Sequence, residues 1–180
     1  SVDRALVTFA IRIWTSPTRW SDREFCSLLN QTIREDGKVS EDTLKHGVIL
    51  CRAINKVLTR RTEYSKEIGA WPDGPDAEDE SCKSDVKNAT FRGSGMADSA
   101  FNFFTQGKKF RTAMFIASSF NKATALNFMR REGNKAEVKP CLWEIKFEAR
   151  NACKHANLVE KLSKVKGEVE FLFPPYSTFT

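Results

Sequence analysis

The chain has 180 residues, of which 41% are hydrophobic and 29% charged, and its formal net charge is +6. This length suits a single folded domain, and the composition excludes a disordered, collagen-like or repeat-built chain. No apolar run reaches the roughly 18 residues of a membrane-spanning helix, so we expect no membrane span. The basic balance leaves open a nucleic acid, an acidic protein or a phosphorylated small molecule as partner, beside a merely solvated basic surface.

Helical periodicity dominates residues 1–70. Apolar side chains recur at helical spacing through residues 2–13, and Ser16-Pro17 end that helix. We expect Ser21 or Asp22 to cap a second helix, and Ser40 to open a third. The first part of the chain is therefore predicted to be a helical lobe.

Residues 71–82 are predicted to form an exposed acidic loop. Two prolines and a glycine interrupt this segment, which carries five acids and no base. The acids are Asp73, Asp76, Glu78, Asp79 and Glu80. The remainder of the chain is thus more basic than the net charge suggests.

Residues 83–180 are rich in strand patterns. We expect strands at residues 88–93 (ended by Gly93 and Gly95), 109–119, 141–147 and 168–173, and helices at 97–106 and 122–131. Helices first and strands later predict an α+β domain whose β core is mixed or antiparallel.

The cysteine and histidine pattern predicts no metal site. The chain has five cysteines, an odd number, with no C-x-x-C spacing, and only two histidines. The cysteines are Cys26, Cys51, Cys82, Cys141 and Cys153. Unpaired thiols favour a reducing intracellular compartment, and an effector that is secreted and delivered into a cell is the alternative.

The last predicted strand carries two carboxylates. Strand alternation places Val169, Phe171 and Phe173 towards the core, and Glu168 with Glu170 on the opposite face, roughly 6.5–7 Å apart. Two like charges side by side cost stability unless a cation or a binding cleft uses them. E-x-E alone is common, so a solvent-facing strand with incidental glutamates stays open.

Two further strand ends carry polar groups. Arg92 precedes Gly93, where a guanidinium can bind a phosphate and a glycine lets a ligand approach the backbone; taken alone, Arg92 can equally be an ordinary surface residue. Ser118 and Ser119 end another strand, where their hydroxyls can orient a ligand or simply form a turn. Neither a dinucleotide fingerprint nor a nucleophilic triad is present.

Taken in order, these segments resemble the mono-ADP-ribosyltransferases of the arginine–serine–glutamate type. Phe91-Arg92-Gly93, then residues 115–120 (FIASSF), then residues 168–175 (EVEFLFPP), are similar to the motifs of the cholera-toxin-like branch, which includes vertebrate ecto-enzymes and bacterial toxins. Residues 13–15 and 28–34 are similar to the helical lobe of that family, and Ala125-x-x-Phe128 falls at a family position. The resemblance covers almost the whole chain and implies a single ADP-ribosyltransferase domain, 1–180, with a two-sheet core and an NAD cleft.

The resemblance implies a set of NAD-binding residues. Arg92 would hold a phosphate of NAD, and the Gly93 backbone would hydrogen-bond the nicotinamide amide. Phe128 would lie against the nicotinamide ring, and Arg131 would make a second phosphate contact. NAD would be a co-substrate, and no metal is implied.

The resemblance also implies the catalytic residues. Glu170 would stabilise the oxocarbenium ion as nicotinamide leaves, and Glu168 would orient the acceptor and take its proton. Ser118 and Ser119 would position the ribose and Glu170. The chain departs from the family at Ala117, where a serine usually helps to hold the catalytic glutamate.

The implied function is transfer of ADP-ribose from NAD to an arginine of a target protein. The alternatives are an NAD glycohydrolase on the same fold and a catalytically silent NAD-binding domain. A basic nucleic-acid-binding module ranks last, because no recognition motif supports it. The lysine-rich segment 151–167 favours an acidic patch on the target protein, or is simply a solvated basic loop, and we expect a monomer.

Overall fold

The computed structural model describes residues 2–20, 22–60, 63–64, 68, 89–133, 137–147 and 155–180. Its helices are α1 (Val2–Trp14), α2 (Phe25–Arg34), the 3₁₀ helix η1 (Asp36–Lys38), α3 (Glu41–Thr59), α5 (Asp98–Phe101) and α6 (Lys122–Gly133). Its strands are β1 (Arg19–Trp20), β2 (Arg23–Glu24), β3 (Ala89–Ala97), β4 (Phe110–Arg111), β5 (Ile116–Ser119), β6 (Val138–Lys146), β7 (Asn157–Leu158), β8 (Glu170–Phe173) and β9 (Thr178–Phe179). The predicted acidic loop at 71–82 lies outside the described residues.

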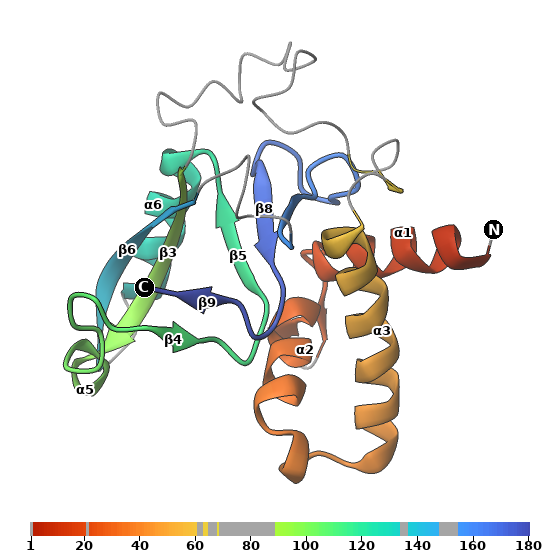
Figure 1. The fold of residues 1–180 in the computed structure, drawn as a ribbon, viewed down its shortest axis with the longest axis horizontal. Helices are drawn as coiled ribbons and strands as arrows, with labels where there is room; N and C mark the ends of the chain where they lie inside the picture. The colour runs from red at the N-terminus through yellow and green to blue at the C-terminus, as the bar shows by residue number, and fades with distance from the viewer. Residues whose placement is uncertain are drawn as a thin grey trace.

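The main sheet has five strands in the order β6-β3-β5-β8-β7, and neighbouring strands are antiparallel. A two-stranded sheet, β4-β9, lies beside it. Figure 1 shows α1, α2 and α3 gathered beyond β8, while α6 covers β3 and β6 at the other side. The α+β class and the helical lobe are therefore confirmed.

The sheet separates two hydrophobic cores. Leu172 of β8 belongs to the core that joins the sheet to α1, α2 and α3. Phe171 and Phe173 belong to the core on the opposite face, with Phe120 and Val169. Because successive strand residues point to opposite faces, β8 is buried on both sides, and all four of its residues are buried. The face that carries Glu170 is thus a packed interface between the sheet and the helical lobe.

The helix starts were predicted with mixed success. Ser40 caps α3, since its hydroxyl accepts the N–H of Thr43, and this capping contributes about 1 kcal/mol. The prediction that Ser21 or Asp22 caps α2 is wrong: the N-cap is Glu24, which makes no side-chain capping bond. The reason is a hairpin, β1 paired with β2, that turns at Asp22 with a φ of 66° before the helix begins.

The prediction that Gly93 and Gly95 end the strand is wrong. β3 continues through both to Ala97 and pairs with β6 along its whole length. A Cβ on Gly93 would lie 1.8 Å from the carbonyl oxygen of Ala125 and 2.4 Å from the backbone nitrogen of Met129. The glycine is required because α6 packs directly on the backbone of β3.

Two other predicted segments are shorter in the structure. Residues 109–119 form β4 and β5, which belong to different sheets. Phe115 lies between β4 and β5. Its N–H donates to the side-chain oxygen of Asn30 at 3.0 Å, and its carbonyl accepts from the side-chain nitrogen of Asn30 at 3.2 Å. The backbone of Phe115 therefore bonds to a residue of α2 rather than to a neighbouring strand. The helix expected at 97–106 is only the short α5.

Candidate functional site

The predicted site residues meet where β3, β5 and β8 lie side by side. Ser119 of β5 is paired with Glu170 of β8 on one side and with Phe91 of β3 on the other. Arg92 follows Phe91, and Glu168 precedes β8. The sheet register thus gathers residues that are about 80 positions apart in the sequence.

Glu170 is a buried carboxylate. Its Oε1 accepts a hydrogen bond of 2.9 Å from the indole Nε1 of Trp14, at the end of α1. Burial raises the pKa of Glu170 to about 7, because a carboxylate loses its hydration there, while the hydrogen bond from Trp14 and the charge of Arg92 lower it. The group is therefore poised to change protonation near neutral pH.

Glu168 lies just outside the strand. Val169 has a φ of 47°, unusual for a β-branched residue, so the regular alternation expected over residues 168–173 begins only at Glu170. Partial burial and the negative charges of Glu160 and Glu24 raise the pKa of Glu168, whereas the positive charge of Arg131 lowers it. Glu168 is thus a half-buried carboxylate in an acidic setting.

Arg92 brings a positive charge to the buried site. Its Nη1 donates to the carbonyl oxygen of Ala117 at 2.7 Å, one of the five donors that a guanidinium carries. Burial lowers its pKa, and Cys26, Glu170 and Glu132 counteract that effect. An arginine stays charged under these conditions, so Arg92 is a cation whose charge acts on the pKa of Glu170.

The two serines have different environments. The Ser118 hydroxyl lies 2.9 Å from both Thr90 Oγ1 and the carbonyl oxygen of Phe171, which links three strands on the face opposite Glu170. The Ser119 hydroxyl donates to the carbonyl oxygen of Glu168 and accepts the N–H of Asn121. Each hydroxyl proton has a partner other than the Glu170 carboxylate.

Phe128 and Arg131 lie together on α6. The Arg131 guanidinium sits 4.6 Å from the centre of the Phe128 ring and 3.4 Å from the Glu132 carboxylate. Arg131 is also close enough to lower the pKa of Glu168. These two residues therefore border the acidic end of the site, on the helix that packs against Gly93.

Sequence reasoning did not assign a site role to Trp14, Glu24, Cys26 or Glu160. Trp14 carried a signal, because a buried indole N–H needs an acceptor and few acceptors face a core. Burial and the charges of Glu24 and Glu170 raise the pKa of the Cys26 thiol to about 12, which keeps it neutral. Cys26, Cys51 and Cys141 are free thiols, whereas Cys82 and Cys153 lie outside the described residues.

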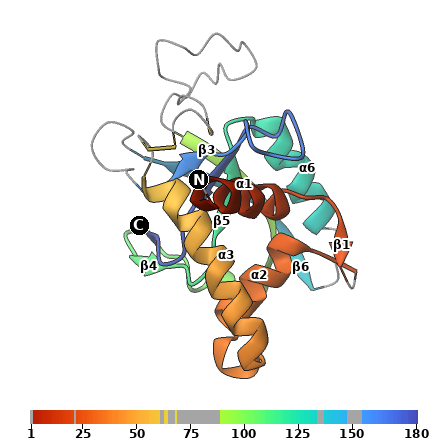
Figure 2. The same ribbon diagram turned by 90° about the vertical axis from the view of Figure 1, so that its right-hand side faces the viewer.

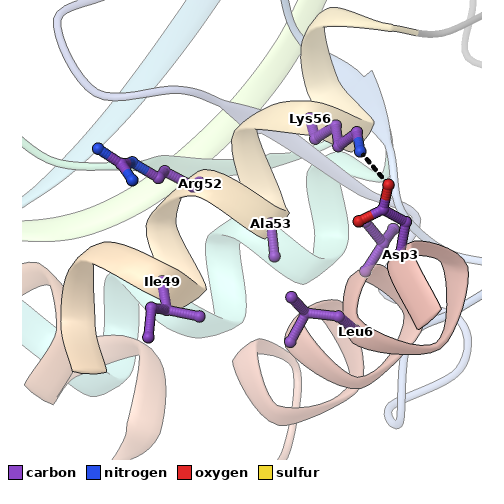
Figure 3. Close-up of a pocket in the computed structure, with 7 residues that line it drawn as sticks. Asp3, Leu6, Ile49, Arg52, Ala53 and Lys56 are labelled. Atoms are coloured by element: carbon purple, nitrogen blue, oxygen red, sulfur yellow. Dashed lines mark hydrogen bonds and ion pairs between the residues drawn. The ribbon is translucent and has the colours of Figure 1, made fainter. Parts of the chain in front are cut away.

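A shallow groove of about 250 Å³ lies elsewhere, between α1 and α3 (Figure 3). An ion pair of 2.8 Å between Lys56 and Asp3 closes one end, and the remaining lining is mostly aliphatic. It contains none of the predicted site residues. Within the described ranges, no three His, Cys, Asp or Glu side chains are grouped to hold a metal, and no helix is long and apolar enough to cross a membrane.

Known structures share this architecture. The Vis toxin, an ADP-ribosyltransferase from Vibrio splendidus, matches with a TM-score of 0.66 and 17% identity over 97% of this chain and 64% of the Vis chain. HopU1, an ADP-ribosyltransferase of Pseudomonas syringae pv. tomato, matches with a TM-score of 0.62 and 14% identity over 97% of this chain and 68% of its own. The C3 exoenzyme of Clostridium limosum matches with a TM-score of 0.52 and 15% identity over 98% of this chain and 76% of its own.

The chain therefore has the fold of the ADP-ribosyltransferases. It spans about two thirds of the length of the Vis toxin chains that it matches. Neither a family model nor a curated protein matches this sequence.

Proposed function

We propose that this protein transfers ADP-ribose from NAD to an arginine side chain of a target protein and releases nicotinamide. The observation that carries the proposal is the juxtaposition of a half-buried cation, Arg92, and a buried carboxylate, Glu170, on an ADP-ribosyltransferase fold. Exoenzyme S, another structure with this fold, is bound to Carba-NAD.

Arg92 and Gly93 are proposed to bind NAD. A guanidinium in a partly desolvated position binds a phosphate through two parallel hydrogen bonds, and Arg92 is anchored to Ala117 in such a position. The backbone of Gly93 is proposed to bond the nicotinamide amide. Phe128 and Arg131 lie on α6, the helix that packs on Gly93, and are proposed as a ring contact for nicotinamide and a second phosphate contact.

Glu170 is proposed as the catalytic carboxylate. As the glycosidic bond from ribose C1′ to the nicotinamide nitrogen breaks, positive charge develops on the ribose, and a carboxylate in a water-poor site stabilises it strongly. The departing nicotinamide takes the bonding electron pair and leaves as a neutral molecule. A developing cation also favours the ionised form of Glu170, whose pKa of about 7 leaves the group close to half ionised at neutral pH.

Glu168 is proposed to bind and deprotonate the acceptor. Glu24 and Glu160 add negative charge around it, and a carboxylate in this setting attracts a guanidinium. One guanidinium nitrogen attacks C1′ and gives its proton to Glu168, whose raised pKa makes it a better base than an exposed glutamate. Vis, which has this fold, has been crystallised with agmatine, a small guanidine.

Ser119 is proposed to position both glutamates through the carbonyl of Glu168. Ser118 is proposed to stabilise the sheet that carries the site, through its hydrogen bonds with Thr90 and Phe171. The lysines Lys161, Lys164 and Lys166 are exposed in the segment that precedes Glu168 and are proposed to favour a target protein with an acidic patch. Lys154 lies outside the described residues.

The test is incubation of the protein with labelled NAD and agmatine, with Glu168→Gln and Glu170→Gln compared to the unmodified chain. We expect the unmodified protein to label agmatine, Glu170→Gln to lose both transfer and nicotinamide release, and Glu168→Gln to lose transfer while still releasing nicotinamide. Glu144→Gln, an exposed change on β6, is the control and should behave like the unmodified protein. Unchanged transfer by Glu170→Gln would refute the proposal.

An NAD glycohydrolase on the same fold is the alternative for which the site gives specific support, because the same Glu170 would stabilise the ribose cation with water as acceptor. Nicotinamide release without labelling of agmatine or of any protein would favour it. A silent NAD-binding domain predicts a thermal shift with NAD and no nicotinamide release.

A further inference from the structure

We infer that Trp14 is the positioning residue of Glu170, supplying from the helical lobe the hydrogen bond that a serine hydroxyl at position 117 would otherwise provide. The inference rests on the proposed function for its catalytic consequence. The contact itself is independent of that function.

The helical lobe holds Trp14 firmly. Its side chain is 3% exposed, and its ring meets that of Phe115 edge to face at 5.1 Å. The next residue, Thr15, accepts the backbone N–H of Lys164 at 2.9 Å, so the end of α1 is also attached to the segment before Glu168. Figure 2, which views the molecule with α1 towards the reader, shows this helix in front of the sheet. Trp14 therefore reaches Glu170 from a fixed position.

The sheet register explains why a serine hydroxyl does not hold the carboxylate. Ala117 is paired with Leu172, and both pack in the core shared with Trp14, so position 117 lies on the same face as Glu170. Its methyl group cannot donate a hydrogen bond. The protons of the Ser118 and Ser119 hydroxyls are directed to other acceptors.

An indole differs chemically from a hydroxyl in this role. Its N–H is a donor only, so it bonds to an oxygen lone pair and favours the ionised carboxylate over the protonated one. A serine hydroxyl can also accept a hydrogen bond from the protonated acid, so its preference for the ionised form is weaker. Trp14 thus both orients Glu170 and stabilises the charged form that the proposed chemistry needs.

The charged surroundings of Glu170 define the expected pH effect. Burial raises its pKa, as do the charges of Glu168 and Glu160 from the preceding segment, while Trp14 from α1 and Arg92 from β3 lower it. Cys26 from α2 is also close and is a neutral thiol. Removal of the indole donor should therefore raise the pKa of Glu170 further and move the activity profile to higher pH.

The contact can be measured without any activity. In ¹⁵N-labelled protein, one of the four indole N–H resonances should shift with pH around a midpoint near 7, disappear in Trp14→Phe, and stop titrating in Glu170→Gln. The resonance of Trp143, whose N–H donates to the Ser94 hydroxyl at 3.0 Å, is an internal reference that should not follow this midpoint. A Trp14 resonance that is unaffected by pH and by Glu170→Gln would overturn the inference.

The positioning role is then tested by nicotinamide release against pH. Trp14→Phe keeps an aromatic ring against Phe115, and we expect its apparent pKa to rise with little change in KM for NAD. A rise of one pH unit would reduce the ionised fraction at pH 7 about fivefold. Trp20→Phe, a change of an exposed tryptophan on β1, should leave the profile unchanged.

The results separate the two proposals. If Trp14→Phe is active and the midpoint of its pH profile for nicotinamide release is unchanged, the positioning role is overturned and the proposed function stays intact. An unmodified protein without nicotinamide release, but with a Trp14 resonance that titrates with Glu170, retains the contact and refutes the enzymatic proposal.

Discussion

The carboxylate of Glu160 accepts the backbone N–H of Val169 at 3.0 Å and that of Gly167 at 2.7 Å. One side chain thereby bridges both sides of Glu168 and supports Val169 in its left-handed conformation. In addition, the N–H of Val159 donates to the carbonyl of Glu170 at 2.9 Å. The segment that carries both candidate glutamates is thus fixed by hydrogen bonds from Val159 and Glu160 as well as by the pairing of β8 in the sheet.

Glu160→Ala should therefore loosen this segment. Each lost charge-assisted hydrogen bond contributes roughly 1.5–3 kcal/mol, so we expect a lower melting temperature and about a tenfold loss of nicotinamide release. Differential scanning fluorimetry and the release assay measure the two effects. Glu144→Ala, an exposed glutamate on β6, is the matched control. Full activity in Glu160→Ala would show that the bridge does not position the glutamates.

Glu170 should make the fold less stable as pH rises. Its folded-state pKa of about 7 lies above the ordinary glutamate value of 4.5, so the folded state binds more protons between these values and stability falls with increasing pH. The effect is up to about 3 kcal/mol, or several degrees in melting temperature. Melting curves from pH 5 to pH 8 should show this decline, and Glu170→Gln should reduce it. An equally steep decline in Glu170→Gln would assign the effect to other groups, Glu168 first.

Gly93→Ala should be severely destabilising. The added Cβ would overlap the backbone of α6 at Ala125 and Met129, neither of which can move without displacing the helix. We expect a cost at or above the upper end of the roughly 1–3 kcal/mol typical of overpacking. Gly37→Ala is the control, because a Cβ there meets nothing within 4 Å. Similar melting temperatures for the two variants would contradict the close packing of β3 and α6.

Substitution of Ser118 should mainly lower stability, whereas substitution of Ser119 should mainly lower kcat. Ser118→Ala removes a hydroxyl that links Thr90 and Phe171, and we expect about 1–2 kcal/mol of lost stability with nearly unchanged kcat. Ser119→Ala removes the bond to the Glu168 carbonyl, and we expect a clear fall in kcat. Chemical denaturation and the release assay measure the two properties. A larger kcat loss in Ser118→Ala than in Ser119→Ala would reverse this assignment.

The sequence by itself determined the order of the elements and the identity of the residues that carry charge. Hydrophobic periodicity located α1, α3 and α6, and the ordered motifs around Arg92, Ser119 and Glu170 pointed to the fold that the structural neighbours confirm. These features are local, because helix periodicity, capping and motif spacing depend on neighbouring residues.

The tertiary structure decided what those residues contact. Strand register places Glu170 beside Ser119, and helix packing brings Trp14 to a carboxylate 156 positions away. The role of Gly93 likewise depends on a helix that follows it in sequence and covers it in space. Such relationships arise from burial and register between distant segments, and no local pattern encodes them. In the sequence, Ala117 shows only that a hydroxyl is missing at this position. The folded chain adds that Trp14, which shares a core with Ala117, donates a hydrogen bond to Glu170.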